Sequence, residues 1–181
     1  KGYKALSLQG GMKAWNFAWN TAEIKLTDAT IIQVRRSSKG CLSYIIGSGS
    51  DAIVVDASLD PQVYIDIAKD NGWIIRYVTD THIHADYLSR TRELAQATNA
   101  KHALIDKASV DYPFVPIESG EQIKIGMVTL EVIHTPGHTL ESTSFRLGDD
   151  AVFTGDTLFV NGVGRPDLKA NQEEANKKSK M

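Results

Sequence analysis

Histidine and aspartate side chains gather in one short stretch of the chain, residues 79–87, which reads Thr-Asp-Thr-His-Ile-His-Ala-Asp-Tyr. Two histidines stand two positions apart, an aspartate follows, and the apolar residues 74–78 lead directly into the stretch. Imidazole nitrogens and carboxylate oxygens are ligands for first-row metals in proteins. The stretch therefore predicts the first wall of a metal site at the end of a strand.

Two later segments share this design of an apolar strand followed by a sharp polar turn. Residues 133–138 (Ile-His-Thr-Pro-Gly-His) lead to His138, and residues 152–156 (Val-Phe-Thr-Gly-Asp) lead to Asp156. Groups at strand ends converge in one crevice when helices cover the outside of an open sheet. A lone histidine is more often structural than a ligand, but three of the five histidines lie at these turns. We predict that His82, His138 and Asp156 meet in one site.

Runs of β-branched and apolar residues, separated by turn residues, predict the strands that carry these turns. Asp60 and a following proline open a helix, which an Asn-Gly pair at 71–72 ends. A second helix is expected over 86–97, with Leu88 and Leu94 facing the core, and the polar residues 169–181 are expected to form a solvated helix. The fold class is α/β (α+β), with strands predicted over 31–34, 42–46, 52–56, 74–78, 101–105, 121–125, 128–134, 142–147 and 151–154.

The composition is that of one globular domain with a small appendage. The chain has 181 residues, 42% hydrophobic and 23% charged, with a net charge of −2, so no basic excess points to nucleic acid. No apolar run approaches the roughly 20 residues that span a bilayer. Cys41, the single cysteine, excludes an internal disulfide framework, and no signal peptide is visible, so we expect a cytoplasmic protein. Because the first residue is Lys1, the natural N-terminus is expected upstream.

Three segments resemble, in order, the metal-binding segments of the metallo-β-lactamase superfamily. They are residues 82–86 (His-Ile-His-Ala-Asp), 135–139 (Thr-Pro-Gly-His-Thr) and 154–158 (Thr-Gly-Asp-Thr-Leu). The resemblance covers roughly residues 25–168. It implies an αβ/βα sandwich over residues 23–181 with the metal at one edge. The superfamily fold normally continues further, so the C-terminal part of the domain is expected to be missing.

Residues 154–159, followed by the Gly-Val-Gly-Arg-Pro-Asp sequence at 162–167, resemble the persulfide dioxygenases of this superfamily. These are similar to glyoxalase II, a thioester hydrolase, but use one iron rather than two metals. The resemblance implies one Fe(II) per chain, held by His82, His138 and Asp156, with zinc as the alternative metal. Two imidazoles and one carboxylate also match the facial triad of non-haem iron oxygenases. The implied substrates are O2 and a small persulfide such as glutathione persulfide, giving sulfite and a thiol.

Two other functions stay open. A dinuclear thioester hydrolase needs a second set of metal ligands. Asp86 is present, but Tyr87 stands where such enzymes have histidine, and no histidine follows His138. The second metal site is therefore expected to be incomplete, although a later histidine beyond residue 181 would change this. The remaining alternative is an incomplete, non-catalytic domain.

Other polar residues near the site have two interpretations each. His84 and Asp86 either orient the ligands or a bound water, or bind the metal directly. Tyr87 is either a hydrogen-bond donor or a packed aromatic. Asp56, at the end of a buried strand, is expected to hydrogen-bond the metal loops. Arg165 either binds a substrate carboxylate or holds its loop by salt bridges.

Two further histidines are weaker candidates. His134 sits at a strand end and is expected to be structural, whereas His102 is expected to face solvent.

Residues 1–22 are predicted to belong to a different domain from the rest of the chain. Residues 3–15 resemble the closing strand and helix of a rhodanese domain, and a Gly-Gly pair precedes a short helical stretch rich in aromatics. This implies a rhodanese-like partner domain upstream in the full-length protein, though Cys41 does not sit in a rhodanese-like active-site loop. The alternative is an N-terminal helix packed on the main domain. A homo-oligomer is also left open.

Overall fold

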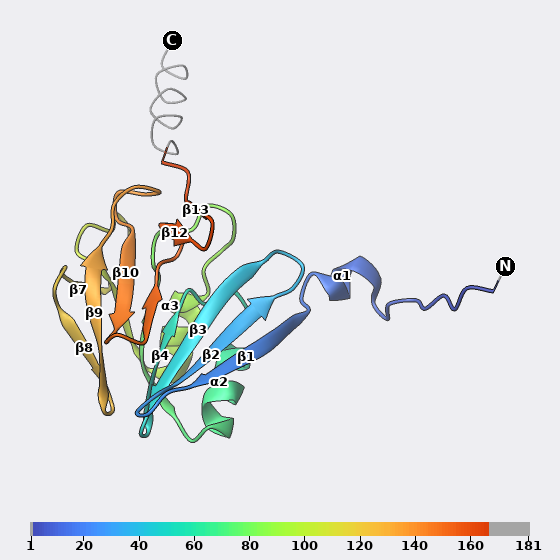
Figure 1. The fold of residues 1–181 in the computed structure, drawn as a ribbon, viewed down its shortest axis with the longest axis horizontal. Helices are drawn as coiled ribbons and strands as arrows, with labels where there is room; N and C mark the ends of the chain where they lie inside the picture. Colours follow the sequence, from blue (N-terminus) through green and yellow to red (C-terminus); the bar gives the residue numbers. More distant parts are fainter. Residues whose placement is uncertain (1, 167–181) are drawn as a thin grey trace, which may run out of the picture.

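The computed structural model describes residues 2–166, in which two β-sheets pack face to face (Figure 1). Seven strands of this part of the chain form the first sheet in sequence order. Strands β1 to β4 pair antiparallel, and β4 to β7 pair parallel. The strands are β1 (Trp19–Lys25), β2 (Thr30–Arg36), β3 (Cys41–Ser48), β4 (Asp51–Val55), β5 (Ile74–Thr79), β6 (Lys101–Ile105) and β7 (Val115–Ile117).

The second sheet is antiparallel, with the order β11-β10-β9-β8. A small hairpin of two strands follows it in the chain. The strands are β8 (Gln122–Ile125), β9 (Val128–His134), β10 (Thr143–Leu147) and β11 (Ala151–Phe153), and the hairpin comprises β12 (Leu158–Phe159) and β13 (Gly162–Val163).

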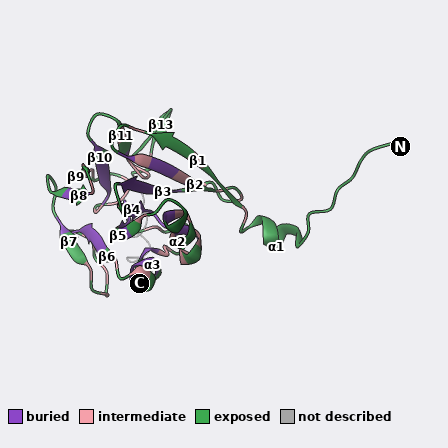
Figure 2. Cartoon of the chain, turned by 90° about the horizontal axis from the view of Figure 1, so that it is seen from below, coloured by how far each residue is buried: buried purple, intermediate pink, exposed green. Residues whose placement is uncertain are grey.

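Alternating side chains of the first sheet divide the core into two layers. Ile46 and Ile53 pack toward the second sheet, whereas Ile45 and Val54 pack toward the helices. This alternation is the period of two expected of strands. β4 is buried on both faces, as its continuous apolar sequence predicts, with residues 52–55 fully buried (Figure 2). The observed layers are therefore helix, sheet and sheet, and the predicted mixed α/β sandwich is confirmed.

Two helices supply the outer layer, α2 (Pro61–Asp70) and α3 (Thr91–Thr98). The predicted start of α2 is confirmed: the Asp60 side chain accepts a hydrogen bond of 2.9 Å from the backbone of Gln62, and proline occupies the first turn. Tyr64 and Ala68 of α2 are buried against the sheet. In the described residues, no helix is long and apolar enough to cross a membrane.

The predicted start of the second helix was wrong. α3 begins only at Thr91, and Leu88, expected in the core, is 75% exposed. The side chains of His84, Tyr87 and Ser89 make polar contacts with residues at the strand ends instead, as when Ser89 donates to Asp80 (2.9 Å). His102 was also misplaced. It is only 8% exposed, and its ring stacks on Tyr112.

The N-terminal segment extends away from the sandwich (Figures 1 and 2). Its helix α1 (Gly11–Trp15) buries none of its residues, so the prediction of a helix packed on the main domain was wrong. Five residues are too few for a stable isolated helix or a large apolar contact. The predicted boundary between residues 22 and 23 falls inside β1, which pairs with β2 along its whole length. The predicted helix over 169–181 lies outside the described residues.

Candidate metal centre

Three strand ends bring His82, His138 and Asp156 together. β5 of the first sheet leads to His82, while β9 and β11 of the second lead to His138 and Asp156. One potential ligand atom from each lies within 4.8 Å of the others. His138 Nε2 is 3.6 Å from Asp156 Oδ2, and the two imidazole rings meet edge to face at 4.9 Å. The cluster spans the edge between the two sheets.

Hydrogen bonds fix which imidazole nitrogen of each histidine can bind a metal. His138 Nδ1 lies 3.2 Å from the carbonyl oxygen of Arg165. Because a carbonyl only accepts, Nδ1 carries the proton and Nε2 has a free lone pair. His82 Nδ1 lies 3.0 Å from Thr81 Oγ1, whose own proton goes to Asp56 at 2.9 Å. Thr81 must therefore accept from Nδ1, which also leaves His82 Nε2 unprotonated. Two free Nε2 atoms beside a carboxylate fit the donor set of a divalent metal.

Asp56 anchors this arrangement from the end of β4. Its Oδ1 accepts a hydrogen bond of 2.7 Å from the backbone nitrogen of Thr81, and both its oxygens contact the Thr81 hydroxyl. β4 and β5 are parallel neighbours, with Val55 paired to Thr79. The segments that follow these two strands therefore leave the sheet side by side. Asp56 thus acts on His82 through Thr81. Its backbone has a φ of 57°, which is uncommon for a non-glycine residue.

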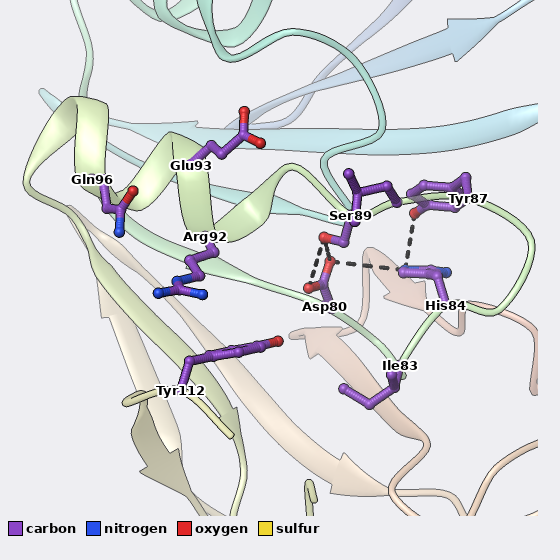
Figure 3. Close-up of a pocket in the computed structure, with 10 residues that line it drawn as sticks. Asp80, Ile83, His84, Tyr87, Ser89, Arg92, Glu93, Gln96 and Tyr112 are labelled. Carbon is purple, nitrogen blue, oxygen red and sulfur yellow. Dashed lines mark hydrogen bonds and ion pairs between the residues drawn. The ribbon is translucent and has the colours of Figure 1, made fainter. Parts of the chain in front are cut away.

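His84 packs against His82, with the two ring centroids 4.1 Å apart, and it also contacts Asp56. Its Nε2 donates to Asp56 Oδ1 at 3.0 Å and lies 2.9 Å from the Tyr87 hydroxyl, while the Tyr87 ring stacks on the imidazole (Figure 3). Burial lowers the pKa of His84, but the hydrogen bond to Asp56 and the charge of Asp80 outweigh it, so the net pKa is raised. With Nε2 occupied in this way, the structure places His84 as a partner of Asp56.

Asp80 is a residue of this region that the sequence analysis did not single out. It is buried and accepts hydrogen bonds from Ser89 (Figure 3) and from Thr91. Burial, and then the charge of Asp56, raise its pKa to about 6. Asp56, Asp80 and His84 form a second cluster within 4.8 Å. The unbroken polar run at residues 79–81, at the end of a buried strand, indicated that Asp80 and Thr81 lie near the site, but it did not indicate what they contact.

The protonation of the remaining groups fits their positions. Burial, and then the neighbouring His84, lower the pKa of His82, which favours the neutral form that a metal requires. Burial raises the pKa of Tyr87, so its phenol stays protonated. Asp86 is exposed and belongs to neither cluster.

Two glycines let the loops close around these residues. Gly155 has a φ of 48°, and a β-carbon there would collide with the Thr81 side chain. A β-carbon on Gly164 would collide with the carbonyl of Asp156 and lie 3.2 Å from His138 Cβ.

The cluster opens into a cavity of about 530 Å³, which Asp156 lines together with Asp86 and Tyr87. Lys39, from the turn between β2 and β3, and Cys41, at the start of β3, also line this cavity. Tyr87 also borders a cavity of about 410 Å³ in front of α3, where the Arg92 guanidinium lies over Tyr112 (Figure 3).

A family model described as the metallo-beta-lactamase superfamily matches residues 38–179, so this chain belongs to that superfamily. A hydroxyacylglutathione hydrolase from Rhodopseudomonas palustris (strain BisB18) is 35% identical over 129 residues, covering 70% of this chain and 50% of the relative. The mitochondrial persulfide dioxygenase ETHE1 of Bos taurus is 31% identical over 136 residues, covering 72% and 54%. The crystal structure of ETHE1 from Myxococcus xanthus matches with a TM-score of 0.69 and 30% identity over 75% of this chain and 61% of that one.

These relatives divide between two enzymatic activities at similar identity. The chain spans about half the length of the curated relatives it matches. The rhodanese-like origin predicted for residues 1–22 gains no support from these matches and stays a prediction.

Proposed function

We propose that this domain is a mononuclear non-haem iron dioxygenase that oxidises a small persulfide. This proposal rests mainly on one observation, the composition of the metal cluster and of the residues beside it. His82, His138 and Asp156 offer two free imidazole nitrogens and a carboxylate within 4.8 Å. Tyr87 stands at the sequence position where the resemblance to two-metal hydrolases implies a histidine ligand. Its phenol stays protonated and is engaged with His84. The similarity to persulfide dioxygenases supports this assignment.

The proposed reaction converts a persulfide, O2 and water to a thiol and sulfite. The S–S bond breaks, the terminal sulfur is oxidised, O2 is reduced, and water supplies the third oxygen of sulfite. Iron(II) held by the three ligands supplies a centre at which a sulfur anion and O2 can both bind.

The residues of the chain orient this centre. Asp56, acting through Thr81, keeps the proton of His82 on Nδ1, and the Arg165 carbonyl does the same for His138. The Arg165 side chain, which extends from the same loop, is proposed to bind a carboxylate of the substrate.

The second candidate is a metal-dependent thioester hydrolase that uses zinc. The similarity to hydroxyacylglutathione hydrolases favours it, and Asp86 lies in the cavity beside Asp156. The hydrolase would need a second metal with ligands besides Asp86.

The experiment that separates the two is metal analysis of anaerobically purified protein combined with two assays. One iron per chain and O2 uptake with glutathione persulfide are expected. Two zinc ions per chain and cleavage of a glutathione thioester would contradict the oxygenase. His82→Ala should abolish both iron binding and O2 uptake, whereas the control His134→Gln should keep both, because His134 contacts the Leu140 carbonyl outside the cluster.

A further inference from the structure

A separate cavity of about 300 Å³ lies on another side of Tyr87 and has a basic lining. Arg36 and Lys39 from the region of the β2–β3 turn, and Arg90 from the start of α3, contribute three cationic side chains. One carboxylate, Asp60, also lines it and already accepts a hydrogen bond from a backbone nitrogen of α2. Glu93 pairs with Arg90 from outside the lining, so the remaining two cations against Asp60 leave a positive balance in a chain whose net charge is −2. The lining therefore favours an anionic ligand.

The two guanidinium groups of this basic cavity are held in place before any ligand binds. Arg36 Nε donates to the carbonyl oxygen of Asn16 at 3.1 Å, and Arg90 pairs with Glu93 at 2.9 Å. Lys39 has no ion pair or side-chain hydrogen bond among residues 2–166, and its ammonium group is free to move toward a ligand. Prepositioned guanidinium groups suit planar carboxylates, which they bind through two parallel hydrogen bonds.

The basic cavity adjoins the one that opens onto the metal cluster. Lys39 and Tyr87 line both cavities, and Asp156 lines the larger. The charges of these cations also affect the pKa of Cys41, which lines the larger cavity. Burial and the charge of Asp86 raise its pKa, and the charges of Arg36 and Lys39 oppose that rise. A ligand with its sulfur near Asp156 can therefore extend past Tyr87 and place an anionic end among the cations.

We propose that the basic cavity binds a carboxylate of the carrier thiol whose persulfide sulfur reacts at His82, His138 and Asp156. The assignment rests on the proposed function for the identity of the reacting group. It makes Lys39 a specificity-determining residue: carriers that bear a carboxylate bind, and uncharged carriers bind more weakly.

The test is a binding measurement that involves no turnover. S-methylglutathione, a thioether with two carboxylates, and its dimethyl ester are titrated into the full chain by calorimetry at low salt. We expect the ester to bind about 2- to 5-fold more weakly, which is the upper part of the range for one partly exposed ion pair. Lys39→Gln should weaken S-methylglutathione by a similar factor and leave the ester unchanged. The control Lys124→Gln, an exposed lysine on the second sheet, should alter neither.

Several results would overturn the proposal. They are equal affinity for acid and ester, unchanged binding in both Lys39→Gln and Arg36→Gln, or binding of inorganic phosphate with no binding of S-methylglutathione. The last would mean a site for free anions only. Charge-dependent binding without any persulfide oxidation would instead contradict the proposed function alone. Persulfide oxidation with charge-independent binding would contradict this inference alone.

Discussion

Replacing Thr81 by valine tests whether the hydroxyl between Asp56 and His82 controls the metal site. Thr81 is 2% exposed, and its Oγ1 donates to Asp56 and accepts from His82 Nδ1. Valine has nearly the same shape but no hydroxyl, so the Nδ1 proton loses its acceptor. Asp56 keeps the 2.7 Å hydrogen bond from the backbone nitrogen of residue 81, so the loop stays anchored.

Two magnitudes follow from these contacts. Leaving a buried donor without a partner costs about 1–3 kcal/mol, so the free energy of unfolding should fall by that amount. Loss of a group that orients a metal-bound histidine typically weakens metal affinity by about 10- to 100-fold. That factor corresponds to roughly 1.4–2.8 kcal/mol of binding free energy. Thr81→Ser keeps the hydroxyl and should retain most of the metal affinity.

The assay is a competitive titration of the apoprotein with Fe(II) or zinc against a chelator, with urea unfolding measured in parallel. A Thr81→Val protein that folds normally and binds metal as tightly as the wild type would show that the Asp56–Thr81–His82 chain does not control the site. Equal losses in the serine and valine variants would show that the hydroxyl is not the controlling group, because serine retains it.

Three further predictions concern neighbouring residues. Gly155→Ala should destabilise the fold by about 1 kcal/mol or more and weaken metal binding, because its φ is positive and its β-carbon would displace Thr81, whereas Gly162→Ala meets open space and should be neutral in thermal unfolding. Because the pKa of Asp80 is raised to about 6 from 3.8, the folded state holds more protons between those values, and its contribution to stability falls as pH rises through that window. Asp80→Asn should remove this loss. The free energy of unfolding, measured in urea, should therefore fall more steeply with pH in the wild type than in the variant between about pH 4 and 6. Tyr87→Phe should cost about 1 kcal/mol through its lost hydrogen bonds but leave one metal per chain, and a stoichiometry of two would contradict the role given to the hydroxyl.

The strand ends that carry the cluster could be predicted because each is an apolar run that stops at a polar turn. Residues 74–78 and 128–134 were placed within a residue or two of β5 and β9. The start of α3 was not predictable in this way. Leu88 has helical spacing to the buried residue Ala95, but the contacts of Ser89 and His84 with Asp80 hold the preceding loop in another shape.

The meeting of His82, His138 and Asp156 could be anticipated from residue types, whereas the role of Thr81 could not. A threonine next to a histidine is common, and only the parallel pairing of β4 with β5 brings the Asp56 carboxylate to its hydroxyl. His102 was misjudged for a similar reason: its stacking partner Tyr112 lies in a loop that propensity does not place.

The left-handed backbone of Asp56 has a consequence for how this protein can change. A non-glycine residue at a φ of 57° is strained by up to about 1–2 kcal/mol, and Asp56→Gly would relieve that strain. Glycine would, however, leave the donors of Thr81 and His84 without their acceptor, at about 1–3 kcal/mol for each buried donor. Variants selected for heat resistance should therefore keep aspartate despite the strain. Variants selected for metal retention should keep aspartate, because the carboxylate holds both Thr81 and His84. Selection for stability and selection for metal binding should therefore both hold the position at aspartate, and its strained backbone should persist in either case.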